Sequence, residues 1–216
     1  MTRWTRNDIF SYYDTVSKPG MTDTGVRSKR SNRMAKIIFI TGGSRSGKSV
    51  YAQRIAESIS GARTYIATCP VIDKEMEDRI RKHKEARQST SWQTIEEVTD
   101  LAGALRRSKG SEVILVDCLT LWINNLMYEA EQEKQHLNED MIGSRCEDVL
   151  GVCSELTGTV IFVTNEVGMG IVPENPSSRL FRDLAGRCNQ RMANHSDIVI
   201  LMVSGLPLYI KGKRIL

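Results

Sequence analysis

The chain has 216 residues, of which 40% are hydrophobic and 26% charged, which suits one α/β domain with a sizeable core and excludes collagen-like and wholly disordered proteins. The net charge of +4 belongs to residues 1–33, which hold seven basic and three acidic residues, whereas the remainder has 23 of each sign. A neutral body argues against nucleic acid as a partner, and no run approaches the ~20 apolar residues that insertion into a membrane requires.

The first 33 residues are polar and rich in Ser, Thr and Arg. This composition predicts a flexible basic extension over residues 1–33, followed by a single domain over residues 34–216. In the alternative interpretation, translation starts at Met34 and the extension is not native. The five cysteines form no CxxC pair and no secretory segment is recognisable, so we expect reduced thiols in a cytoplasmic protein.

From residue 36 onward, short β-branched runs alternate with amphipathic stretches. The predicted strands cover residues 36–41, 64–68, 92–95, 112–117, 159–164 and 197–204, and residues 208–211 are expected to pair with the last of them. The predicted helices cover residues 48–60, 73–87, 96–108, 119–134, 138–156 and 177–194. This alternation predicts an α/β fold with a mainly parallel central sheet and helices on both faces.

A phosphate-binding loop lies between the first strand and the first helix. It fits the pattern G-x-x-x-x-G-K-[ST] with Gly42, Gly43, Ser44, Arg45, Ser46, Gly47, Lys48 and Ser49. Glycines let backbone N–H groups approach phosphate oxygens, and the helix N-terminus adds a favourable dipole. Lys48 is expected to reach the β- and γ-phosphates, and Ser49 to bind Mg²⁺. A chance match in a Gly/Ser-rich turn is the alternative.

Asp117 ends an apolar strand that we expect to lie adjacent to the strand of the phosphate loop. A carboxylate at that tip is where P-loop proteins hold the acid that accompanies Mg²⁺. A helix N-cap for the stretch from Leu119 onward is the competing role. Loop and acid together indicate a nucleoside triphosphatase or transferase, without choosing among kinase, switch and motor.

The predicted helix 73–87 carries a histidine among cations. Arg79, His83 and Arg87 lie at i, i+4 and i+8 and so share one stripe, and Lys84 follows the histidine. Nearby positive charge lowers an imidazole pKa below its reference of ~6.5, which leaves a neutral nucleophile at pH 7 beside cations that suit a polyphosphate. From the residues alone, a solvated basic helix face with an incidental histidine is the favoured interpretation.

Taken together, the motifs resemble the bifunctional adenosylcobinamide kinase / adenosylcobinamide-phosphate guanylyltransferase family. The resemblance covers about residues 36–211. It rests on these blocks: ITGGSRSGKS (40–49), YIAT (65–68), EMxxRIxxHxxxR (75–87), WxTxE (92–96), DCLTLWxxNL (117–126), VTNEVGMGIVPEN (163–175) and RDLAGRxNQ (182–190). The block over 163–175 is the most specific, because nucleotide binding in general does not require it.

The resemblance implies a RecA-like P-loop fold, a homo-oligomer, expected to be a trimer, and two activities. In the first, ATP or GTP phosphorylates the corrinoid adenosylcobinamide. Lys48 and Mg²⁺ on Ser49 neutralise charge in this reaction, and Asp117 orients Mg²⁺ or the nucleophile. In the second, His83 takes GMP from GTP as a guanylyl-histidine, which adenosylcobinamide-phosphate then resolves to adenosylcobinamide-GDP. The resemblance thus reverses the preference for an incidental histidine.

Further nucleotide contacts follow from the matched positions. They are Ala67, Thr68, Cys69, Arg79, Lys84, Arg87 and Glu96, of which Glu96 is suited to accept hydrogen bonds from guanine N1–H and N2–H₂. A helix N-terminal acid is the alternative for Glu96. Residues 165–175 are assigned to the rim of the active site, touching the corrinoid or a neighbouring subunit, with a plain structural loop as the alternative. Cys69 and Cys118 are interpreted as small buried residues.

Three other functions stay open at this point. One is a small-molecule P-loop kinase in which His83 is inert, and the formation of a covalent guanylyl adduct separates it from the bifunctional enzyme. Another is a nucleotide-gated RecA-like binding module, against which the neutral body counts. The last is an enzyme that keeps only the guanylyltransferase activity.

Overall fold

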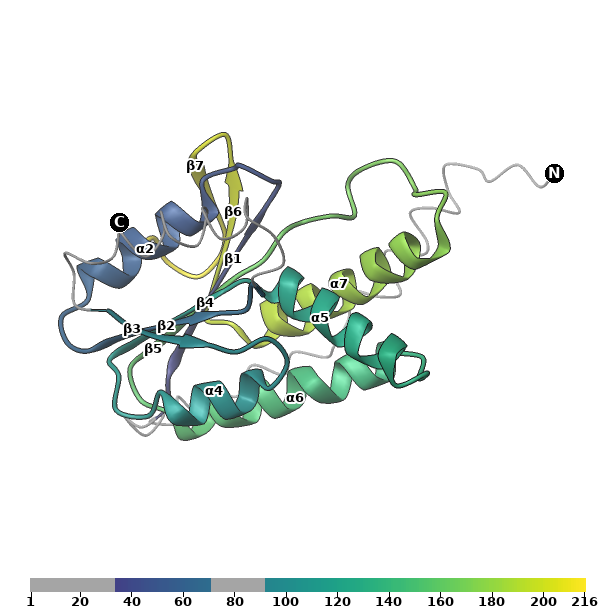
Figure 1. The fold of residues 1–216 in the computed structure, drawn as a ribbon. Helices are drawn as coiled ribbons and strands as arrows, with labels where there is room; N and C mark the ends of the chain where they lie inside the picture. The colour runs from purple at the N-terminus through teal and green to yellow at the C-terminus, as the bar shows by residue number, and fades with distance from the viewer. Residues whose placement is uncertain (1–33, 71–91) are drawn as a thin grey trace, which may run out of the picture. The chain divides into compact units, whose positions relative to one another are not determined.

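The structure is a computed structural model that describes residues 34–70 and 92–216 (Figure 1). The predicted extension over residues 1–33 and the predicted helix over residues 73–87 lie outside the described residues. Within the two described ranges, no helix has both the length and the apolar character to span a bilayer.

The described residues form one seven-stranded sheet in the order β3-β2-β4-β5-β1-β6-β7. Strands β1 to β6 run parallel, and β7 pairs with β6 in the antiparallel sense, as expected for the C-terminal strand. The strands are β1 (Lys36–Gly42), β2 (Arg63–Ala67), β3 (Trp92–Glu96), β4 (Val113–Asp117), β5 (Thr159–Val163), β6 (Ile198–Val203) and β7 (Leu206–Lys211). The α/β class with a mainly parallel sheet is confirmed, and β5 separates β1 from β4.

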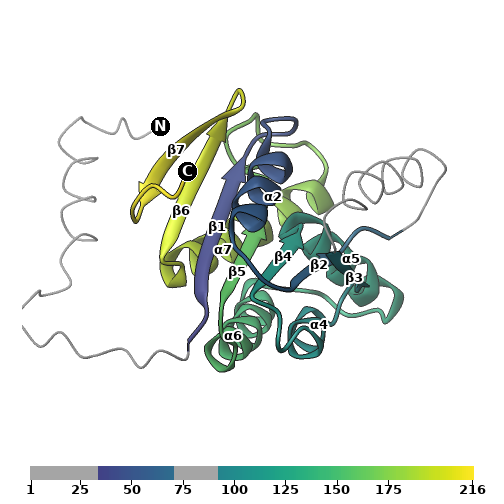
Figure 2. The same cartoon turned by 90° about the vertical axis from the view of Figure 1, so that its left-hand side faces the viewer.

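Helices cover both faces of the sheet, as predicted (Figures 1 and 2). Successive residues of a strand point to opposite faces, so Phe39 of β1 joins the cluster under α4 to α7, whereas Ile38 and Ile40 join the cluster under α2. Strands buried on both faces explain the continuous apolar runs in the sequence. The helices are α2 (Lys48–Ser58), α4 (Leu101–Arg107), α5 (Leu119–Gln132), α6 (Glu139–Glu155) and α7 (Pro176–His195).

The predicted helix over residues 96–108 is wrong at its start. Strand β3 continues through Glu96, and α4 begins only at Leu101, where the side chain of Asp100 accepts a hydrogen bond from Gly103 N at 2.9 Å. An N-cap that satisfies an otherwise unpaired helix N–H fixes the boundary there. Glu96 is therefore the last residue of a strand and not a helix N-terminal acid.

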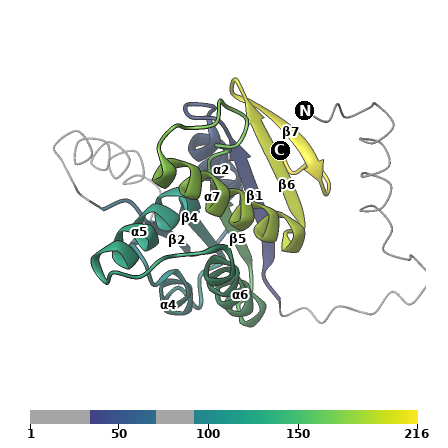
Figure 3. The same ribbon diagram turned by 90° about the vertical axis from the view of Figure 1, so that its right-hand side faces the viewer.

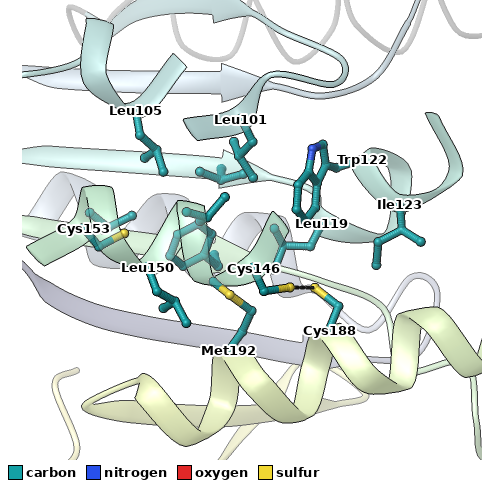
Figure 4. Packing of buried hydrophobic residues seen from close by; sticks show 14 of the residues in the cluster. Leu101, Leu105, Leu119, Trp122, Ile123, Cys146, Leu150, Cys153, Cys188 and Met192 are labelled. Atoms are coloured by element: carbon teal, nitrogen blue, oxygen red, sulfur yellow. Dashed lines mark hydrogen bonds between the residues drawn. The ribbon is translucent and has the colours of Figure 1, made fainter. Parts of the chain in front are cut away.

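The core under α4 to α7 is large and contains sulfur (Figure 4). Trp122 is 1% exposed, and its indole N–H donates to the Thr99 carbonyl at 2.8 Å. Cys146 of α6 and Cys188 of α7 approach to 3.4 Å between sulfurs across the interface of these two helices. None of the five cysteines, all of which the structure describes, forms a disulfide, as the sequence predicts.

Candidate active site

The phosphate loop leaves β1 at Gly42 and enters α2 at Lys48. Gly42 has φ of 148° and Gly47, the N-cap of α2, has φ of 91°, backbone conformations that side-chain-bearing residues rarely adopt. A Cβ at Gly42 would lie 2.5 Å from the Met202 carbonyl oxygen, whereas one at Gly43 would meet nothing within 4 Å. Backbone conformation therefore demands glycine at both ends of the loop but not at Gly43.

Two segments from elsewhere in the sequence hold the loop in place. The Glu166 N–H, which follows β5, donates to the Gly42 carbonyl at 3.0 Å, and the Gly205 N–H in the β6–β7 turn donates to the Ser46 carbonyl at 3.0 Å. The first turn of α2 contains no acidic residue. The helix N-terminus thus offers its partial positive charge to an anion without a carboxylate in its own first turn to offset it.

Lys48 is buried at the base of the loop. Its ammonium donates to the Gly43 carbonyl at 2.6 Å. Burial lowers the pKa of Lys48 below its usual range, and electrostatic interactions with Cys118 and Asp117 oppose that shift. The lysine and the aspartate are therefore close enough to interact electrostatically, as a phosphate-binding lysine and the acid of a P-loop site should.

Asp117 ends β4 and is held by Tyr65, whose hydroxyl donates to Oδ2 at 3.0 Å. Two details differ from the sequence prediction. Strand β4 is not adjacent to β1, because β5 pairs with both. Nor is Asp117 the N-cap of α5, which is Cys118 without a side-chain cap. The side chain of Asp117 is thus available to the site, and its position is set by a tyrosine that the sequence did not single out.

The carboxyl ends of five parallel strands form one row along the sheet edge. In register, Ile40 faces Val163, Val163 faces Asp117, Asp117 faces Ala67, and Ala67 faces Glu96. Strand spacing of about 4.8 Å places Glu96 roughly 10 Å beyond Asp117. By the two-residue period, both acids lie on the face of the sheet that α2 covers. The sheet therefore brings the two predicted acids and the phosphate loop to one edge.

Thr68 and Cys118 are buried and hydrogen-bonded to each other, whereas Cys69 is partly exposed. Thr68 is 0% exposed, and its hydroxyl donates to the Cys118 carbonyl at 2.8 Å and accepts the Cys118 N–H at 2.7 Å. Burial and the charge of Asp117 raise the pKa of Cys118 to about 12, so its thiol is not a nucleophile at neutral pH. Cys69 is only half-buried, in contrast to the prediction, because it stands in the turn that leaves β2.

A buried polar network fixes the start of the loop 164–175. The Thr164 hydroxyl donates to Asn189 Oδ1 at 2.9 Å and lies 3.1 Å from the Thr120 hydroxyl, which in turn accepts the Asn165 N–H at 2.6 Å. Asn189 Nδ2 donates to the Asn165 carbonyl at 3.1 Å. Sequence reasoning missed this network, although the resemblance blocks contain all four residues.

The predicted site residues fall into two groups, those that the structure describes and those outside the described residues. Gly42 to Ser49, Asp117, Glu96 and residues 67–69 all lie at the carboxyl edge of the sheet. Arg79, His83, Lys84 and Arg87 lie outside the described residues. Tyr65 carried a detectable signal, because it precedes Ala67 by two residues in a strand and so must share its face.

Comparison with known proteins gives consistent matches. A family model described as cobinamide kinase / cobinamide phosphate guanyltransferase matches residues 38–210. The bifunctional adenosylcobalamin biosynthesis protein CobU of Escherichia coli K12 is 37% identical over 182 residues, which cover 81% of this chain and 99% of that protein. The protein of the same description named CobP from Pseudomonas aeruginosa is 41% identical over 176 residues, covering 81% and 97%. The flagellar accessory protein FlaH of Methanocaldococcus jannaschii aligns with a TM-score of 0.46 and 17% identity over 84% of this chain and 80% of that chain.

Proposed function

The chain belongs to the cobinamide kinase / cobinamide phosphate guanyltransferase family, and we propose that it catalyses both reactions in that name. The observation that carries the proposal is coverage: relatives described as bifunctional match over 97–99% of their length, and the match spans the phosphate loop and Asp117. A likeness confined to the phosphate loop would support nucleotide binding alone.

In the kinase reaction, the acceptor hydroxyl attacks the γ-phosphorus of ATP or GTP. A bond from the hydroxyl oxygen to phosphorus forms, the bond to the bridging oxygen of the β-phosphate breaks, and the nucleoside diphosphate leaves while the proton passes to solvent. Lys48 and the N–H groups of the loop offset the charge on the phosphates. Asp117, oriented by Tyr65, positions the groups around the γ-phosphate.

The residues at the site suit Mg²⁺. The hydroxyl of Ser49 and the carboxylate of Asp117 are hard oxygen donors of the kind that this ion prefers, and Mg²⁺ usually takes one or two protein oxygens together with phosphate oxygens and water. When bound, the ion neutralises charge on the β- and γ-phosphates. The Tyr65 hydroxyl restrains the carboxylate on Oδ2.

In the transferase reaction, an imidazole nitrogen of His83 attacks the α-phosphorus of GTP and pyrophosphate leaves. A phosphate oxygen of the phosphorylated corrinoid then attacks the same phosphorus and breaks the P–N bond, which frees the histidine. Support comes from the R-I-x-x-H pattern and its cations Arg79, Lys84 and Arg87. Glu96, on the same face as Asp117, is the residue that we assign to guanine recognition. Glu96→Gln should therefore weaken the binding of GTP more than the binding of ATP.

Intact-protein mass spectrometry tests the covalent step. We expect incubation with Mg²⁺ and GTP, without corrinoid, to add one acid-labile guanylyl group to the wild type and to His136→Ala, and none to His83→Ala. His136 is the matched control because it is exposed in the short connection between α5 and α6. An adduct on His83→Ala, or none on a wild type that binds GTP, would overturn the histidine mechanism and favour a simple kinase.

A separate assay tests the kinase half. Transfer of labelled γ-phosphate from ATP or GTP to cobinamide should fall at least 100-fold in Lys48→Met, because the lysine stabilises charge that develops in the transition state. An enzyme that forms the guanylyl adduct but never phosphorylates cobinamide would be a guanylyltransferase alone. Binding of nucleotide with neither reaction would indicate a nucleotide-gated module.

We also propose that the protein is a cytoplasmic homo-oligomer, with a trimer expected from the resemblance. Five cysteines with no disulfide among them suit a reducing compartment. The edge strand β7 leaves Leu206 72% and Leu208 57% exposed, opposite Val203 and Leu201 of β6, and such an apolar row suits contact with a second copy. Sedimentation at several concentrations should give one species heavier than the monomer, and a monomer throughout would refute this assembly.

A further inference from the structure

A cavity of about 860 Å³ opens on the face of the sheet opposite α2. Its walls are α7, the loop 164–175, the first residue of α6 and strands β1, β6 and β7, and Figure 3 shows how these elements are arranged. This volume lies within the range of small-molecule sites, which is about 300–1,000 Å³. The nucleotide residues described above do not account for it.

The cavity shares a wall with the phosphate loop. Thr41 and Glu166 both line it. Thr41 directly precedes Gly42, and the Glu166 N–H donates to the Gly42 carbonyl at 3.0 Å. A molecule in the cavity would therefore sit beside the phosphates, on the other side of the sheet edge from Asp117.

One side of the cavity is apolar and open. Met169 is 80% exposed, Val172 58% and Ile210 61%, although all three are large apolar side chains. Clustered exposure of this kind marks a surface that binds something. Two of these residues belong to the loop 164–175 and the third to β7, so the apolar rim spans the mouth.

The other side is polar. Helix α7 contributes Arg182, whose Nε lies 3.5 Å from the Asp183 carboxylate, and Gln190, whose amide can donate and accept hydrogen bonds. Thr41, at the floor, is 8% exposed, and its hydroxyl oxygen has no hydrogen-bond partner among the described residues. Buried hydroxyl groups normally have a hydrogen-bond partner, so a polar group of a bound ligand would satisfy this oxygen.

We propose that this cavity binds the corrinoid acceptor, an inference that rests on the function proposed above. A corrin is a broad macrocycle with apolar faces and an edge that carries carboxamides, and both halves of the cavity match it. The apolar face would rest on Met169, Val172 and Ile210, and the amides would meet Arg182 and Gln190. Its hydroxyl-bearing arm then crosses the sheet edge at Glu166 to reach the phosphates. The two resemblance blocks over 163–175 and 182–190, which nucleotide binding leaves unexplained, converge here.

Gly186 supplies a clean way to block the cavity. It lies in α7 on the cavity wall, and a Cβ there would meet nothing within 4 Å. Gly186→Leu should therefore fill the cavity without straining the helix. Gly151→Leu is the matched control, because Gly151 is exposed within α6, also has no atom within 4 Å of a Cβ, and lies outside the cavity.

The measurements are cobinamide titration by calorimetry, KM for cobinamide in the kinase assay, GTP affinity and sedimentation. We expect Gly186→Leu to weaken cobinamide binding at least tenfold with GTP affinity and oligomeric state unchanged, and Gly151→Leu to match the wild type. Gln190→Ala should raise KM for cobinamide three- to tenfold with kcat held.

Cobinamide binding by Gly186→Leu within twofold of the wild type would overturn the proposal. A loss of binding that occurs only with a changed oligomeric state would also overturn it, in favour of an interface between copies. A wild type that does not phosphorylate cobinamide would instead refute the proposed function, so the two failures are distinguishable.

Discussion

The phosphate loop should tolerate alanine at one of two adjacent glycines and not at the other. At Gly42, φ of 148° costs a residue with a side chain about 1–3 kcal/mol. A Cβ would also lie 2.5 Å from the Met202 carbonyl oxygen, and relieving such a contact costs a further 1–3 kcal/mol or so. Gly42→Ala should therefore lower the free energy of unfolding by about 2–6 kcal/mol.

At Gly43 both penalties are absent. The residue is not among those with positive φ, and a Cβ meets nothing within 4 Å. Replacing such a glycine restricts the unfolded chain, which stabilises the fold by about 0.4–1 kcal/mol. The two variants should then differ by at least about 2.4 kcal/mol.

Thermal unfolding followed by circular dichroism decides the matter. In a protein of this size, 1 kcal/mol moves Tm by about 2–4 °C, so Gly42→Ala should melt at least about 5 °C below Gly43→Ala. The comparison is made without nucleotide, which keeps any effect of either methyl group on phosphate binding out of the result. Melting temperatures within 2 °C of each other would refute the reasoning from backbone geometry.

Three further predictions concern Tyr65, Glu97 and the cysteines. Tyr65→Phe removes the hydrogen bond that Tyr65 donates to the Asp117 carboxylate, and a hydrogen bond to a charged group is worth about 1.5–3 kcal/mol. The kcat for phosphoryl transfer should therefore fall at least tenfold. An unchanged kcat would contradict the role of Tyr65 in positioning Asp117. Burial opposes ionisation of Glu97, but the Asp100 N–H, Arg107 and the Thr99 N–H together lower its pKa in the folded protein. Glu97→Gln should therefore lower Tm at pH 7, and this effect should disappear as the pH falls below about 4.5 and through the lowered pKa of the folded state. An equal decrease in Tm at pH 3 would contradict this reasoning. Under native conditions a thiol reagent should label Cys69 alone of the five cysteines, and GTP should slow that labelling; mass spectrometry that finds Cys118 or Cys153 modified first would contradict their raised pKa values of about 12.

The sequence was informative wherever one segment decides the outcome. The run Lys36–Gly42 is buried along almost its whole length, so its apolar character alone predicts a central strand. The phosphate loop was recognisable because a strand, a glycine-rich turn and a helix must follow in that order. The start of α4 was not, because an extended segment and a capping aspartate compete with an amphipathic pattern that begins five residues earlier.

Contacts between distant segments were beyond sequence reasoning. Nothing local indicates that β5 lies between β1 and β4, and so Asp117 was placed one strand too close to the phosphate loop. The same applies to Thr68, whose hydroxyl spends both of its hydrogen bonds on the Cys118 backbone fifty residues away. Strand order is chosen by the packing of all the helices together, and no single window of sequence contains it.

The sheet also explains how one phosphate loop can serve two unlike substrates. Asp117 and Glu96 stand on the α2 face, where the nucleotide is expected, whereas Thr41 faces α7 and the cavity assigned to the corrinoid. Neighbouring residues in a strand point to opposite faces of the sheet. At the end of β1, Thr41 therefore faces the cavity while the next residue, Gly42, begins the phosphate loop. The substrates can then be recognised by separate walls and still meet at the phosphates. Substitutions at Gln190 of α7 should therefore alter acceptor use without altering nucleotide affinity, and substitutions at Glu96 should do the reverse.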